Sequence, residues 1–119
     1  MKEHFMKLKP EPFGMIKDGK KTIELRLYDE KRKTVAVGDI IIFTNTASPD
    51  EILRAEVKEL FVFDSFDTLY KSLPLCECGY TEDNIASASP RDMESYYSKE
   101  EQSRYGVVGI KISVLQNEG

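Results

Sequence analysis

The segment from Lys21 to Tyr28 constrains the fold of this chain most, because polar and apolar residues alternate from Thr22 onward. A period of two is that of a β-strand, whose successive side chains point to opposite faces of a sheet. The apolar face would hold Ile23, Leu25 and Leu27. The opposite face carries Glu24 and Arg26 and must be either solvated or functional.

The other segments predict an α+β fold. Strands are expected over residues 4–8, 40–44, 52–63 and 106–112, where β-branched or alternating apolar residues gather. Helices are expected from Pro10 to a glycine stop at Gly19, and after the capping residues Ser65, Ser89 and Ser98. With 119 residues the chain can bury one core. We predict one domain over 1–119, a small curved antiparallel sheet or β-barrel with short flanking helices.

The cellular compartment and the need for cofactors are predicted from features that the sequence lacks. Its longest apolar run, residues 40–43, is far shorter than the roughly 20 residues of a membrane helix, so a cytoplasmic protein without membrane contact is expected. Cys76 and Cys78 are too close together to staple a fold, and His4 has no partner at metal-ligand spacing. We therefore expect no disulfide, no metal and no cofactor.

The charge is unevenly distributed along the chain. Residues 1–33 hold ten Lys and Arg against six Asp and Glu, whereas residues 34–119 hold seven against fifteen. A basic region attracts anionic ligands by electrostatic steering. The alternative is a solvated basic face that binds nothing.

The element Gly19-x-Lys21-x-x-Glu24-x-Arg26 is the most specific candidate site. On a strand that rises about 3.3 Å per residue, its three ionisable groups lie within roughly 10 Å of one another. Lys21 and Arg26 can hold a phosphate or carboxylate, and Glu24 can accept hydrogen bonds from a base or orient Lys21. The alternative is a ladder of exposed salt bridges, each contributing about 0.2 to 1 kcal/mol.

Residues outside this element extend the candidate site. Lys31 and Arg32 follow the strand directly and could contact the backbone phosphates of a nucleic acid. Tyr97 could stack on a base, which contributes about 1 to 3 kcal/mol, or could instead pack against the core.

Catalysis by the usual nucleophiles is poorly supported, since the chain has a single histidine and no Gly-x-Ser-x-Gly element. Lys20 occupies the position of the second glycine of a phosphate-binding loop, which excludes that motif. Lys21, beside Lys20 and Arg26, remains a candidate general base, with Glu24 as its partner or as a general acid.

These elements together resemble the ASCH (ASC-1 homology) domain family over nearly the whole chain. The matching residues are His4 to Lys7, Pro12-Phe13, the element from Gly19 to Arg26, Lys31-Arg32, Gly38-Asp39 and Tyr105-Gly106-Val107. The resemblance implies a PUA-like β-barrel with helices beside a cleft that binds RNA or a nucleotide. We take Lys21, Glu24, Arg26, Lys31, Arg32 and Tyr97 as its ligand-binding residues.

The resemblance also implies an alternative, because some small bacterial members are amidohydrolases that deacetylate N4-acetylcytidine with a Lys, a Thr and a Glu. Their Lys corresponds to Lys21, but Glu24 stands in place of the Thr, so that hydroxyl is missing. Glu77 and Glu82 are the candidates for their Glu. A third possibility is a protein-interaction domain that uses the apolar run 60–63, if that run is exposed.

Overall fold

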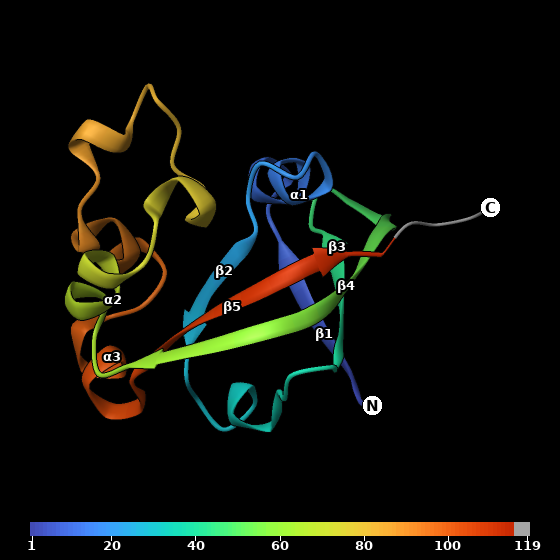
Figure 1. The fold of residues 1–119 in the computed structure, drawn as a ribbon, viewed down its shortest axis with the longest axis horizontal. Helices are drawn as coiled ribbons and strands as arrows, with labels where there is room; N and C mark the ends of the chain where they lie inside the picture. The colour runs from blue at the N-terminus through green and yellow to red at the C-terminus, as the bar shows by residue number, and fades with distance from the viewer. Residues whose placement is uncertain (116–119) are drawn as a thin grey trace.

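Five strands form one mixed sheet in the order β1-β3-β4-β5-β2. The computed structural model, drawn in Figure 1, describes residues 1–115. The strands are β1 (Glu3–Leu8), β2 (Ile23–Leu27), β3 (Ile40–Asn45), β4 (Ser48–Phe63) and β5 (Val107–Val114). The sheet curls into a half-barrel, which confirms the predicted fold class, although β1 runs parallel to β3 and the sheet is not wholly antiparallel. A long crossover through α1 and β2 separates these two strands, and parallel pairing requires such a connection.

The sixteen-residue strand β4 produces the curl. Its first half pairs with β3 and its second half with β5, and the register shifts between Val57 and Glu59. A bulge of this kind bends a strand and increases its twist. The strand begins at Ser48, four residues before the predicted start at residue 52, because the chain reverses in a tight hairpin after Asn45.

Short helices cover one end and one side of the sheet. They are α1 (Pro10–Lys17), α2 (Phe66–Ser72) and α3 (Lys99–Tyr105), with 3-10 turns η1 (Arg32–Thr34), η2 (Leu75–Cys78), η3 (Ile85–Ser87) and η4 (Pro90–Ser95). Ser65, Ser89 and Ser98 cap the elements that follow them, as predicted. In Figure 1, α1 lies across one end of the half-barrel, while α2, α3 and the turns between them form a helical lobe beside β2.

The core has two parts, and β2 separates them. The barrel cluster includes Phe13, Ile16, Phe43, Val57, Val108 and Ile110. The lobe cluster includes Ile23, Leu25, Leu27, Phe66, Leu69 and Val107. The apolar face of β2 therefore packs against the helical lobe and not against the inside of the barrel.

The polar face of β2 turns toward the barrel interior. Glu24 lies opposite Ile110 and Arg26 opposite Val108 in the antiparallel register with β5. Residues directly opposite each other share one face of a sheet, and Ile110 and Val108 belong to the barrel cluster. Glu24 and Arg26 thus stand on the concave side of the half-barrel.

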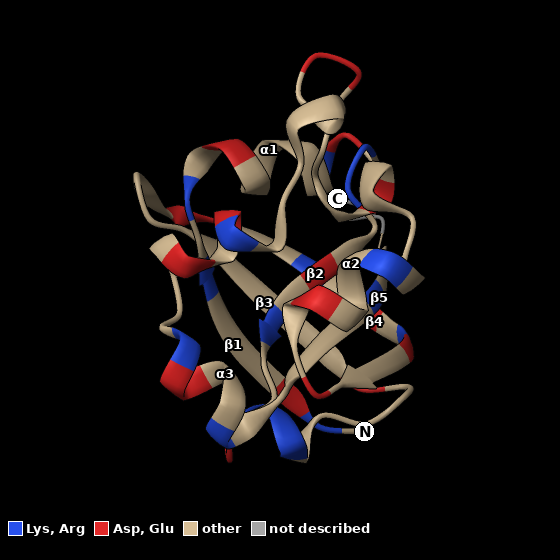
Figure 2. Ribbon diagram, turned by 90° about the vertical axis from the view of Figure 1, so that its left-hand side faces the viewer, with Lys and Arg blue, Asp and Glu red and all other residues tan. Residues whose placement is uncertain are grey.

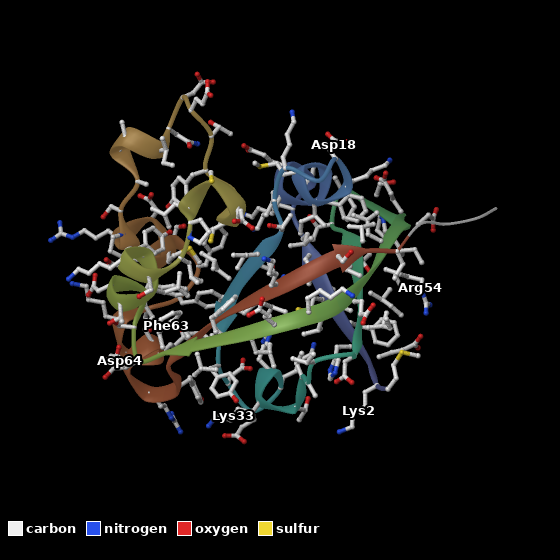
Figure 3. All side chains as sticks on the ribbon, viewed as in Figure 1. Lys2, Asp18, Lys33, Arg54, Phe63 and Asp64 are labelled. Atoms are coloured by element: carbon white, nitrogen blue, oxygen red, sulfur yellow. The ribbon has the colours of Figure 1, made fainter. Side chains whose placement is uncertain are left out.

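The apolar run 60–63 lies in the second half of β4. Leu60 packs against the barrel cluster and Phe63 against the lobe cluster, beside the start of α2 (Figure 3). Val62 is exposed. Val62 is thus the one exposed side chain of the run, and the other three are half-buried, which does not favour the protein-interaction hypothesis.

A buried polar pair joins β1 to the turn before β3. His4 Nε2 lies 2.8 Å from Asp39 Oδ2, and the same carboxylate accepts hydrogen bonds from the backbone N–H groups of Lys2 and Ala36. These bonds, the one with His4 first, lower the pKa of Asp39 from 3.8 to about 2. The pair anchors the start of the only parallel strand pair in residues 1–115.

We predict that Asp39→Asn lowers the thermal midpoint at pH 7 and flattens its dependence on pH between about 4 and 2. Because the folded-state pKa is depressed, the Asp39 carboxylate stabilises the fold above its unfolded pKa, and this contribution is lost as pH falls through the folded pKa. Thermal melts over this range test the prediction, with Asp50→Asn as the control, because Asp50 is an exposed residue near the start of β4. Parallel pH profiles for the wild type and Asp39→Asn would contradict it.

Candidate functional site

A cleft of about 460 Å³ separates the half-barrel from the helical lobe. Its barrel side comes from the end of β1, from α1 and from β2, and its lobe side from η2, η4 and the two tyrosines after η4. Volumes of about 300 to 1,000 Å³ are typical of small-molecule sites. The predicted residues Lys21, Glu24, Arg26 and Tyr97 all line this cleft.

Lys21, Glu24 and Arg26 form a cluster of ion pairs, here called the floor cluster. Lys21 Nζ lies 2.8 Å from Glu24 Oε1, and Arg26 Nε lies 2.6 Å from Glu24 Oε2. Their side chains are 11%, 4% and 12% exposed, respectively. This burial excludes the exposed salt-bridge ladder that the spacing alone also allowed.

The two cations keep the buried carboxylate of Glu24 charged. Burial alone would raise the pKa of Glu24, but the charges and hydrogen bonds of Lys21 and Arg26 lower it below its ordinary value. Burial likewise opposes the charge on Arg26, yet Glu24 and then Tyr97 raise the pKa of its guanidinium. The floor cluster therefore holds two cations and one anion.

Arg26 also links the two edge strands of the half-barrel. Its Nη2 donates to the backbone carbonyl of Lys7 on β1, at 2.8 Å. A guanidinium has five N–H donors and an ammonium has three, and Glu24 and Lys7 use only some of them. The floor cluster can thus donate further hydrogen bonds to a ligand.

The backbone around Lys21 is fixed from two sides. Gly19, with a φ of 78°, ends α1 as the sequence predicts, and the N–H of Lys21 donates to the carbonyl of Met15. Gly79 in turn has a φ of 110°, and a Cβ there would lie 3.3 Å from Lys21 Cδ. The Lys21 side chain therefore runs directly along the backbone that follows η2.

Glu77 holds η2 against the start of β2. Its carbonyl accepts from the N–H of Thr22, and its Oε1 accepts from Thr22 Oγ1 at 2.8 Å. Neither residue lines the cleft, and Glu82 is exposed outside it. Of the two glutamates suggested by the family resemblance, Glu77 is thus the one next to the floor cluster.

Tyr97 packs against the core and also lines the cleft, so its stacking on a base stays a prediction. Its ring stacks on Phe66 of the lobe cluster, with centroids 6.2 Å apart and planes 17° apart, and it also lines the cleft. Burial raises the pKa of its hydroxyl, and the charge of Arg26 opposes this shift. The neighbouring Tyr96 is exposed and lies under Lys9 Nζ, 5.2 Å from the ring centroid.

The lobe side of the cleft carries a second cluster of polar side chains, which the sequence analysis did not predict. The hydroxyls of Tyr70 and Tyr80 lie 2.7 Å apart, and Tyr80 donates to Asp92 Oδ2 at 2.7 Å. All three residues line the cleft. The sequence indicates a helix start at Ser89, three residues before Asp92, but no motif that joins Asp92 to the two tyrosines.

Lys31 and Arg32 do not line the cleft. They lie in and beside η1, which Figure 1 places at the end of the sheet opposite α1. Arg32 Nη1 pairs with Asp29 Oδ2 at 2.9 Å, and Lys31 is exposed. Contacts of Lys31 and Arg32 with phosphate remain a prediction, which the geometry of the cleft does not support.

The cleft is less basic than the charge count of residues 1–33 suggests. Its lining carries the cations Lys7, Lys9, Lys21 and Arg26 and the acids Glu11, Glu24 and Asp92. Figure 2, viewed from the side of the helical lobe, shows acidic and basic segments interspersed along the ribbon. The cleft therefore does not offer a uniformly basic surface to an anion.

Thiol and metal chemistry find little support in the cleft. Cys78 lines it, but burial raises the pKa of this thiol to about 12, so it is not a thiolate nucleophile near neutral pH. Within residues 1–115, no group of three or more His, Cys, Asp or Glu side chains is arranged to hold a metal ion.

A curled α+β sheet with a ligand-sized cleft beside a helical lobe defines a small PUA-like domain. The sequence model of the ASCH domain matches residues 6–116, and the chain belongs to this family. A search of curated proteins finds no significant match to this chain. Among residues 1–115, no helix has the length and apolar character needed to cross a membrane.

Solved structures agree with this assignment. The crystal structure of the hypothetical protein PH0355 is 33% identical, with a TM-score of 0.78, and the match covers 97% of this chain and 100% of that one. The solution structure of PF0455 from Pyrococcus furiosus is 32% identical over 97% and 99% of the two chains, with a TM-score of 0.73. The ASCH protein of Zymomonas mobilis shares the fold at 19% identity, with a TM-score of 0.67 over 94% of this chain and 67% of that one.

We predict that Glu24→Gln destabilises the fold by about 3 to 5 kcal/mol, because it leaves two buried cations without their counter-ion. Glu56→Gln is the matched control, since Glu56 pairs with Lys58 at the surface, where an ion pair contributes about 0 to 1 kcal/mol. Chemical denaturation of both variants measures the difference. Equal losses for the two would show that the floor cluster is not a buried, mutually dependent unit.

Proposed function

We propose that the cleft binds one nucleoside unit, either as a free nucleotide or as a base of single-stranded RNA. The observation that carries the proposal is the buried floor cluster, which combines unused hydrogen-bond donors with a cleft lined by tyrosines. A nucleobase matches this arrangement, because it has a flat apolar face and hydrogen-bonding groups along its edge. Membership of the ASCH family is consistent with RNA or nucleotide binding.

In this proposal each part of the cleft has one task. The base lies beside Tyr97 and Met93, and its carbonyl groups accept hydrogen bonds from Lys21 and Arg26. Glu24 orients both cations and offers its remaining lone pairs to an amino group of the base. Lys7 and Lys9, which are exposed at the edge of the cleft, are available to a phosphate. Lys31 and Arg32 are not needed for a single nucleoside unit.

We predict that Lys21→Ala weakens binding of cytidine monophosphate and of short single-stranded RNA at least about tenfold, as expected for a lost charged hydrogen bond. Lys20→Ala is the matched control, because Lys20 is the exposed neighbour of Lys21 and does not line the cleft. Calorimetric titration at several salt concentrations measures both variants. RNA affinity should also fall with salt. Absence of binding at low salt, or equal affinities for the two variants, would contradict the proposal.

Hydrolysis of an acylated nucleoside is the second candidate, because the amine of Lys21 lies at the cleft beside a carboxylate. A general base needs an unengaged amine, whereas Lys21 Nζ is held in an ion pair with Glu24 Oε1 at 2.8 Å. The hydroxyl of Thr22 is already bonded to Glu77 outside the cleft lining. The geometry therefore favours binding over turnover.

We accordingly expect that purified protein releases no more acetate from N4-acetylcytidine than the Lys21→Ala variant does. Acetate can be followed by proton NMR over hours at neutral pH. Release by the wild type that Lys21→Ala abolishes and Lys20→Ala retains would establish the hydrolase in place of simple binding.

A further inference from the structure

We propose that Asp92 accepts a hydrogen bond from the ribose 2′-hydroxyl of the bound unit, so that the cleft selects ribonucleosides over deoxyribonucleosides. This inference rests on the proposed function, because it concerns the sugar of the same ligand. It assigns a specificity role to the lobe side of the cleft, whose polar residues belong neither to the floor cluster nor to the ASCH motif.

The hydrogen bonds among Tyr70, Tyr80 and Asp92 have a defined direction. A carboxylate can only accept, so the single hydroxyl proton of Tyr80 goes to Asp92 Oδ2. Tyr70 must then donate its own proton to the Tyr80 oxygen. Burial, followed by these hydrogen bonds, raises the pKa of Tyr80. Tyr80 thus donates directly to Asp92, and Tyr70 fixes the Tyr80 hydroxyl in that direction, so the carboxylate is held in one orientation.

The arrangement leaves one carboxylate oxygen for a ligand. The N–H of Ser89 also donates to Oδ2, at 3.1 Å, as part of the capping box of η4. No donor within residues 1–115 bonds to Oδ1, and Asp92 lines the cleft. A fixed carboxylate oxygen accepts from a hydroxyl or an amino group and repels a phosphate. The group bound there must therefore be a neutral or cationic donor.

Burial indicates which part of a nucleoside reaches Asp92. The floor cluster is almost fully buried, whereas Asp92 and Tyr96 are exposed. A nucleoside that places its base on the floor cluster carries its sugar toward this exposed edge. In an RNA strand the 3′ oxygen is esterified, so the 2′-hydroxyl is the ribose donor that remains, and DNA lacks it.

The test compares three ligands that share one base: cytidine, 2′-deoxycytidine and 2′-deoxy-2′-fluorocytidine. The fluoro analogue keeps a ribose-like sugar pucker but has no donor at the 2′ position. We expect the wild type to bind cytidine about tenfold more tightly than either analogue, as for a hydrogen bond to a charged group. Titration calorimetry or ligand-detected NMR can measure these affinities.

Three variants separate the role of Asp92 in sugar selection from its role in folding. Asp92→Asn should remove most of the preference, whereas Glu94→Gln, in the same turn but outside the lining of this cleft, should keep it. Tyr80→Phe retains the carboxylate but removes one donor that orients it, and should reduce the preference in part. Circular dichroism verifies the fold of each variant. The comparison of the three ligands on the wild type uses no substitution, so a folding defect cannot affect it.

The outcomes distinguish the two proposals. Equal binding of cytidine and 2′-deoxycytidine by the wild type overturns the role of Asp92 and leaves nucleoside binding intact. An unchanged preference in folded Asp92→Asn overturns it as well. Failure of all three ligands to bind overturns the proposed function and this inference with it.

Discussion

The ion pairs of Glu24 are the interaction on which the rest of the site depends. A carboxylate on the concave face of a half-barrel loses most of its hydration, and that loss costs several kcal/mol unless cations replace the water. Lys21 and Arg26 do so at 2.8 and 2.6 Å. Arg26 then extends to the carbonyl of Lys7, so that one charged cluster links the edge strands β1 and β2, which no backbone ladder joins.

The same arrangement explains why the cleft lies beside β2. The apolar face of this strand packs against the helical lobe, and its charged face turns inward, so the strand belongs to both halves of the molecule. The lobe in turn supplies Tyr97, Tyr80 and Asp92 across the cleft. A ligand between the two halves meets donors on the barrel side and an oriented acceptor on the lobe side, which together favour a molecule with both kinds of group.

Much of the fold could be predicted from local patterns, because strand alternation and serine caps act over a few residues. The shared face of Glu24 and Arg26 followed from the period of two, and Gly19 correctly marked the end of α1. Whether that face meets solvent or the barrel interior depends on the curl of β4, which is a tertiary property. Asp92 meets Tyr80 only through the folding of the lobe, and no sequence motif joins the two residues. Lys31 follows β2 closely in sequence, but the length of β2 places it away from the cleft.

The most direct test of this account is a crystal structure of the protein with cytidine. The account predicts a base beside Tyr97, with at least one of its carbonyl or amino groups within hydrogen-bond distance of Lys21, Glu24 or Arg26, and a ribose near Asp92. Cytidine bound elsewhere on the molecule, with the floor cluster making no contact to it, would contradict the central claim.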